Sequence, residues 1–200
     1  MIKKYGDYAQ NTGTYRLADN PQLYEIQRTN NFEFVVTDLD NIKRAGAVGT
    51  EKDAYLTNGQ EILRMSVSSA FVPHFTQQPI SVKRGNNEMK FAGVPTFDAG
   101  ELTFNDFIGA EVKAYLMAWQ NLSYDVNTER VGSLDVTNYK KDCYLIEYTP
   151  DYRKVRQWIL KGCWISALKE GAYSHDNNNK QQINVTIQYD KGYIDNSDLL

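Results

Sequence analysis

Ile183-Asn184-Val185-Thr186-Ile187-Gln188-Tyr189 is the stretch that decides the fold class. Its apolar residues alternate strictly with polar ones, and this period of two predicts a β-strand with one buried face. Further short runs of β-type residues recur along the chain, separated by turn signals. The sequence therefore predicts a mainly β fold: two packed antiparallel sheets that form a β-sandwich or barrel, with one flanking helix.

Seven further segments have strand character. In the segment at 158–164, Trp158, Leu160, Gly162 and Trp164 are expected to share one face, and at 85–87 a Gly-Asn-Asn turn separates two of the runs. The predicted strands lie at residues 32–36, 62–72, 80–84, 89–91, 101–104, 143–148 and 158–164.

One helix is predicted at about residues 106–122. Asn105 or Asp106 is a suitable cap, and Glu111 is an acidic residue in the early turns. A single apolar stripe follows the helical period, so the helix should lie against a sheet. The stripe consists of Ile108, Val112, Tyr115, Leu116 and Trp119.

The chain is expected to contain one main domain. Residues 1–30 are polar and without period, which predicts an N-terminal arm; residues 31–193 form the β domain, and residues 194–200 a C-terminal tail. A polar, glycine-containing stretch at 38–60 predicts a long loop. Pro73 and Pro79 bracket a shorter connection.

Composition excludes several classes of protein. The 200 residues carry a formal net charge of −3, and the basic residues are dispersed, which argues against nucleic-acid binding through a basic patch. The N-terminal residues are not expected to act as a signal peptide, and no apolar run has the length that spans a membrane. Tyrosine is the most frequent aromatic, with 14 copies against 8 Phe, and it suits strands and half-wet interfaces.

No catalytic, cofactor-binding or metal-binding residue is predicted. Dinucleotide, P-loop and nucleophile-elbow motifs are absent from the sequence. His74 and His175 lie far apart in predicted loops without ligand spacing. Cys143 and Cys163 are interpreted as reduced structural thiols, which come near each other if their strands pair.

Weaker signals have plainer explanations. The Asp176–Asn179 run lacks the glycine and distal glutamate of a calcium loop, so a hairpin tip is favoured. A glycosylation triplet at Asn184 lies inside a strand. The three tryptophans are read as core residues rather than a ligand cage. They are Trp119, Trp158 and Trp164.

Several segments, in order, resemble the tail tube proteins of contractile-tailed bacteriophages. The first runs from Phe91-Ala-Gly-Val-Pro-Thr-Phe-Asp98 through Ala-Gly-Glu-Leu-Thr-Phe-Asn-Asp106 to the helix ending near Trp119. The second is Trp158-Ile-Leu-Lys-Gly-Cys-Trp164, where Ile165 replaces the usual proline. The third runs from Leu168-Lys-Glu-Gly-Ala-Tyr173 to the strand ending at Asp190. The likeness spans about residues 31–193.

The resemblance implies a structural virion protein of the tail, assembled in the host cytoplasm. Six copies would form a ring, the inner sheets of the ring would join into a barrel, and stacked rings would form a tube. The implied partners are further copies, the tail sheath, the baseplate and terminator proteins, and double-stranded DNA that passes through the lumen without specific binding. A conduit of this kind should be lined by neutral polar and acidic side chains.

Contacts between rings are expected from three segments: the arm, the 38–60 loop and the Val72–Pro79 connection. The first alternative is a baseplate tube initiator, tail completion protein or other contractile-injection tube protein of the same fold. A second alternative is a small-molecule-binding β-barrel, which would need an internal cavity. An enzyme is the third alternative.

Overall fold

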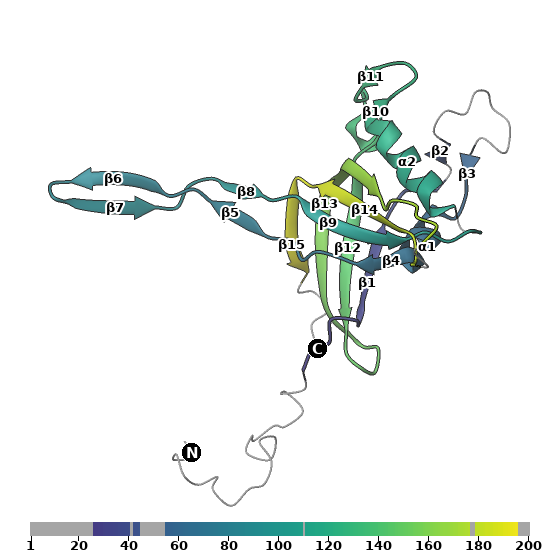
Figure 1. Cartoon of the computed structure of the whole chain (residues 1–200). Coiled ribbons are helices and arrows are strands. Elements are labelled where there is room, and N and C mark those ends of the chain that lie inside the picture. Colours follow the sequence, from purple (N-terminus) through teal and green to yellow (C-terminus); the bar gives the residue numbers. More distant parts are fainter. Residues whose placement is uncertain (1–25, 41, 45–54, 110, 177–178, 196–200) are drawn as a thin grey trace, which may run out of the picture.

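The structure is a computed structural model that describes residues 26–40, 42–44, 55–109, 111–176 and 179–195. A curled antiparallel sheet wraps around the core, two helices lie beside it, and a narrow two-stranded ribbon projects away (Figure 1). The predicted mainly β fold with a flanking helix is confirmed. Most of the predicted arm and tail lies outside the described residues, as do residues 41 and 45–54 of the predicted 38–60 loop. The described part of that loop contains the short pair β2 (Ile42–Lys43) and β3 (Tyr55–Leu56) and the start of α1 (Gly59–Ser66).

The main sheet has seven strands in the order β1-β12-β13-β14-β9-β4, with β15 also paired to β13. All of its pairings are antiparallel. The strands are β1 (Phe32–Val36), β4 (Val67–Ser69), β9 (Gly100–Asn105), β12 (Lys141–Tyr148), β13 (Lys154–Glu170), β14 (Gln182–Gln188) and β15 (Lys191–Asp195).

Strand β13 belongs to two halves of this sheet. Its residues 154–163 pair with β12, and residues 157–161 also pair with β15. Its residues 164–170 pair with β14. We call β1, β12, β13 (154–163) and β15 the first half-sheet, and β13 (164–170), β14, β9 and β4 the second half-sheet. The two halves correspond to the two packed sheets that the sequence predicts.

Shorter elements complete the described chain. They are the pairs β2 (Ile42–Lys43) with β3 (Tyr55–Leu56) and β10 (Tyr124–Asp125) with β11 (Arg130–Val131), a 3-10 turn at Val136–Asn138, and the ribbon strands β5 (Phe75–Gln77), β6 (Ile80–Arg84), β7 (Asn87–Phe91) and β8 (Pro95–Phe97).

The predicted helix is present as α2 (Val112–Ser123), but it begins later than residue 106. Asn105 remains in β9 opposite Gln182, and the Asp106 amide donates to the Gln181 carbonyl. Strand pairing therefore holds both expected caps away from the helix. Ile108 precedes the helix and is fully exposed, whereas the other four residues of the stripe are buried.

The predicted strand at 62–72 is wrong over most of its length. Residues Gly59–Ser66 form helix α1, and only Val67–Ser69 become β4. Gly59, Leu63 and Ser66 are the buried positions of α1, at spacings of four and three residues. The helical period of this segment was hard to recognise in the sequence, because its residues also alternate loosely with period two.

The core lies between the half-sheets and α2. Its largest fully buried side chains include Trp119, Tyr115, Phe34 and Phe104. The Trp119 indole donates a hydrogen bond of 3.0 Å to the Tyr139 carbonyl, which satisfies its polar atom inside the core. These large side chains occupy the interior of the curled sheet.

Gly162 is the point where β13 changes partners. It has a φ of +69°, and the buried positions shift there from Leu160 to Cys163 and Ile165. A Cβ at Gly162 would lie 2.2 Å from a carboxylate oxygen of Asp190. The shift corrects the prediction that Trp158, Leu160, Gly162 and Trp164 share one face. Trp158 packs against the core, whereas Trp164 lies opposite Gln188 outside it.

We expect Gly162→Ala to lower the free energy of unfolding by more than Gly132→Ala. Both glycines have positive φ, so each alanine costs about 1–2 kcal/mol of backbone strain. Only the Gly162 variant must also displace Asp190 from its ion pair with Lys140, since nothing lies within 4 Å of a Cβ at Gly132. Equal losses in urea unfolding would contradict a tight contact at this bend.

Tyr148 joins β12 to β1 through a polar contact. Its hydroxyl donates to Oε2 of Glu33 at 2.7 Å, and Oε1 of Glu33 lies 3.1 Å from Nε of Arg64 in α1. Burial, followed by this hydrogen bond and the Glu33 charge, raises the pKa of Tyr148 to about 12. The folded state therefore holds the phenol proton more tightly than the unfolded state does.

A raised phenol pKa stabilises the fold below about pH 10, and this contribution disappears between about pH 10 and pH 12. We expect the loss of unfolding free energy over that window to be smaller in Tyr148→Phe than in the parent chain. Tyr152→Phe is the matched control, because Tyr152 is 83% exposed. Urea unfolding at the two ends of the window measures the difference, and identical losses in both variants would contradict the assignment.

Candidate functional site: a projecting ribbon and open sheet edges

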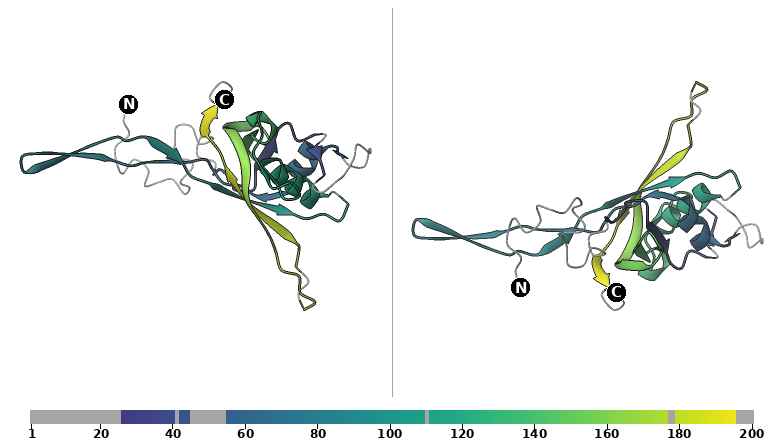
Figure 2. Two further views of the ribbon diagram at one scale, coloured as in Figure 1. Left: turned by 90° about the horizontal axis from the view of Figure 1, so that it is seen from above. Right: turned by 90° about the horizontal axis from the view of Figure 1, so that it is seen from below.

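A two-stranded ribbon of residues 75–97 projects far from the body of the molecule (Figures 1 and 2). The part of the ribbon nearer the body pairs β5 with β8, and the part farther from the body, called the outer part, pairs β6 with β7. Every residue of β5, β6 and β7 is exposed. An isolated two-stranded ribbon is marginally stable in water, so a ribbon of this length is expected to contact a partner.

The two faces of the outer ribbon differ in character. One face carries the cross-strand pairs Ile80–Phe91 and Val82–Met89, and these four side chains are 45–56% exposed. The opposite face carries Ser81–Lys90 and Lys83–Glu88. Side chains alternate across a strand, so the apolar pairs form a continuous exposed strip on one side.

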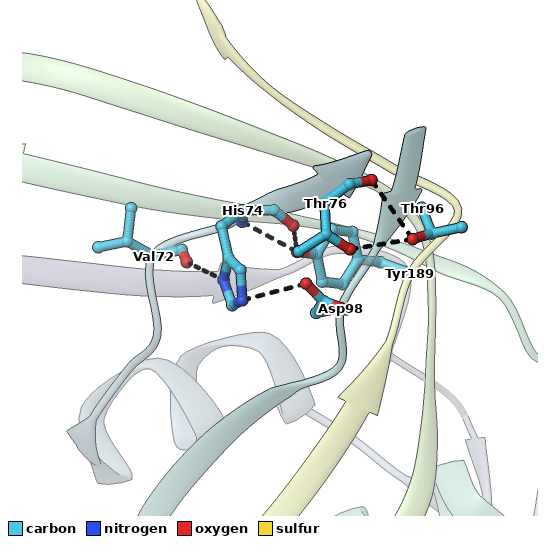
Figure 3. Close-up of polar contacts among 6 residues, drawn as sticks. All are labelled: Val72, His74, Thr76, Thr96, Asp98 and Tyr189. Carbon is cyan, nitrogen blue, oxygen red and sulfur yellow. Dashed lines mark hydrogen bonds and ion pairs between the residues drawn. The ribbon is translucent and has the colours of Figure 1, made fainter. Parts of the chain in front are cut away.

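The ribbon is anchored to the core by Tyr189. Its hydroxyl donates to the His74 carbonyl at 3.1 Å, and the His74 amide donates back to the hydroxyl at 3.2 Å (Figure 3). The Tyr189 ring stacks on Phe71 and also contacts Phe97, with centroids 5.7 and 5.8 Å apart. Phe97 in turn meets Phe75 at 5.9 Å. This aromatic series fixes the base of the ribbon.

Close backbone contact shapes the ribbon where β5 leads into β6. A Cβ at Gly93 would lie 2.0 Å from the Gln78 carbonyl oxygen, so a residue without a side chain is required there. This contact was not predicted from the sequence, and the glycine of the Ala-Gly-Val-Pro segment at 92–95 is the signal that could have located it. The predicted Val72–Pro79 connection thus contains the first strand of the ribbon, and Pro79 lies between β5 and β6.

His74 lies at the base of the ribbon, beside Asp98. Its Nε2 atom is 3.4 Å from Oδ2 of Asp98, and the two side chains are 63% and 42% exposed (Figure 3). His175 is exposed and far from it in the sequence. In the described part of the chain, no cluster of three or more His, Cys, Asp or Glu residues is placed to hold a metal ion.

Cys143 and Cys163 are free thiols inside the core, and both are fully buried. Burial, followed by the hydrogen bond to Cys163, raises the pKa of Cys143 well above its ordinary value. The expectation that the two thiols lie close together is confirmed, and their full burial suits a structural role. The triplet at Asn184 lies within β14, as expected.

The main sheet has open edges as well. β1 and β15 have no described strand on their outer sides, nor does β4. Residues 164–170 of β13 pair with β14 on one side, and no described strand pairs with the other side. Unpaired edges bind further strands readily, so they are candidate contacts between copies. Neither described helix has the length and apolar character to cross a membrane.

The sequence matches no protein-family model and no curated protein. Solved structures are similar. A chain of the PVC sheath–tube complex, from an extracellular contractile injection system in the extended state, has a TM-score of 0.58 at 16% identity. The match covers 92% of this chain and 98% of that chain.

Two further solved structures are similar to this chain. The sheath/tube terminator of the same PVC system has a TM-score of 0.58 at 16% identity, with 86% and 97% of the two chains covered. The tube-terminating cap of the anti-feeding prophage has a TM-score of 0.55 at 15% identity, with 86% and 91% covered. At these identities the likeness establishes the fold. This chain therefore has the β-rich fold of tube and terminator proteins of contractile injection systems.

Proposed function

We propose that this chain is a tail tube subunit of a contractile-tailed bacteriophage. In this proposal, six copies form a ring, and stacked rings conduct double-stranded DNA during ejection and template the sheath. The protein is structural rather than enzymatic, acts in the virion tail, and assembles in the host cytoplasm. Its partners are its own copies, the sheath, the baseplate and the terminator.

One observation carries the proposal: the exposed apolar strip of the ribbon on a chain whose fold matches tube-type proteins over nearly its whole length. The strip formed by Ile80, Val82, Met89 and Phe91 has no contact in the described subunit that would cover it. A second copy would bury it. We therefore assign contact between stacked rings to the ribbon, in keeping with the expectation for the Val72–Pro79 connection.

A terminator or initiator of the same fold is the second candidate. Likeness to the PVC terminator and to the anti-feeding prophage cap favours it. Negative-stain microscopy of the purified chain separates the candidates. Long tubes of identical rings support the main tube subunit, and single rings that never elongate support the terminator. Dispersed monomers at all concentrations would overturn both.

The ribbon assignment predicts that Val82→Asp prevents stacking into tubes. A buried carboxylate without a partner costs several kcal/mol, whereas Val82 is 47% exposed in the subunit, so the fold should be retained. Ser81→Asp is the matched control, because it adds the same charge next to Val82 on the opposite face of β6. Microscopy and thermal unfolding measure the two effects.

The expected result is tubes for Ser81→Asp, none for Val82→Asp, and similar unfolding temperatures for both. Tubes of normal length from Val82→Asp would remove the ribbon from the stacking contact. A large drop in the unfolding temperature of both variants would show that the ribbon stabilises the subunit itself.

A further inference from the structure

The outward face of the second half-sheet is almost free of charge. Opposite the buried residues of β9 and β14 lie side chains that carry hydroxyl or amide groups. Among the paired positions on this outward face only Glu101 and Lys169 bear charge, and they are of opposite sign. Trp164 and Ala167 of β13 lie opposite Gln188 and Thr186 on the same face. The neutral side chains are Thr103, Asn105, Gln182, Asn184, Thr186 and Gln188.

Several of these polar groups bond to each other along the face. Thr103 Oγ1 donates to Asn184 Oδ1 at 3.0 Å, and Gln182 Nε2 lies 3.3 Å from Asn105 Oδ1 and 3.4 Å from Ser68 Oγ. These contacts join β4, β9 and β14 laterally. Groups that already have partners have little capacity left to hold a passing polymer.

The outward face of the first half-sheet has a different chemistry. Val35, Tyr144, Ile159 and Tyr193 form one row across its four strands. Lys161 lies directly opposite Lys191. A hydrogen bond between Lys161 Nζ and Asp142 Oδ2, of 2.6 Å, raises the pKa of Lys161 and keeps it charged. Asp142 compensates the charge of Lys161, but a ring of further lysines such as Lys191 would hold DNA or other anionic cargo at the wall.

The strand directions of the second half-sheet suit closure into a ring. Its four strands alternate in direction, so β4 and the 164–170 segment of β13 run antiparallel to each other. β4 of one copy can therefore pair with β13 of the next copy without interrupting the antiparallel pattern. Such a contact joins two different edges, and contacts of this kind generate closed rings.

From this comparison we infer that the second half-sheet lines the bore of the ring, with its face of Thr, Asn and Gln side chains directed to the lumen. Its open edges, β4 and residues 164–170 of β13, join neighbouring copies. The first half-sheet then faces away from the bore. The inference rests on the proposed assembly into rings and adds the identity of the luminal surface.

Cysteine accessibility in assembled tubes tests the inference. Asn184→Cys places a thiol on the Thr/Asn/Gln face, and Lys191→Cys is the matched variant on the other face; both positions are exposed in the subunit. The native thiols, Cys143 and Cys163, are fully buried, so the parent chain gives the background. Each variant is treated with N-ethylmaleimide or with a long polyethylene-glycol maleimide, before and after assembly.

We expect Asn184→Cys to lose its reaction with the long reagent on assembly and to retain its reaction with N-ethylmaleimide. A narrow bore excludes the polymer and admits the small probe. Lys191→Cys should lack this selectivity for the small probe. Thr186→Cys, on the same face as Asn184, replaces Asn184→Cys if that variant does not fold.

Each other outcome is decisive. Tubes in which Asn184→Cys still reacts with the long reagent place the face outside the bore, and tubes in which it reacts with neither reagent place it in a subunit contact. Both results overturn the luminal assignment and leave the tube function intact. If the parent chain forms no rings at all, the proposed function fails, and the luminal assignment fails with it.

Discussion

The pairing of β13 is the constraint on which the rest of the structure depends. This one strand supplies the last strand of the second half-sheet and a central strand of the first. The left-handed backbone at Gly162 lets the strand bend where the partner changes from β15 to β14. Both half-sheets are therefore oriented by a single covalent segment. The core side chains of α2 fill the space that this bend creates.

The same strand determines what remains available for assembly. Since β12 stops pairing at Cys163, the edge of residues 164–170 stays open. An open edge is an aggregation hazard in a monomer and a specific contact in a closed ring. The ribbon presents a similar case, because its apolar strip is unfavourable in water and useful against another copy. Both features are consistent with the self-assembly proposed above.

Much of the fold was predictable, because alternation with period two is a local property. The strands around Phe34, Leu145 and Val185 followed from it. The helix that contains Trp119 followed from the helical period, which is equally local. Predictions failed where two periods coexist or where the phase changes. Helix α1 was interpreted as a strand, and Trp164 was assigned to the core because no signal marked the bend at Gly162 as a change of face.

The sequence by itself determined which segments form strands, where the main helix lies, and that no catalytic motif is present. Only the tertiary structure decided which apolar faces are covered. Ile80 and Val82 alternate with polar residues just as Ile183 and Val185 do, yet the first pair is exposed and the second is buried. The physical reason is that alternation fixes the direction of a side chain relative to its own strand, whereas burial depends on what distant segments pack against that face.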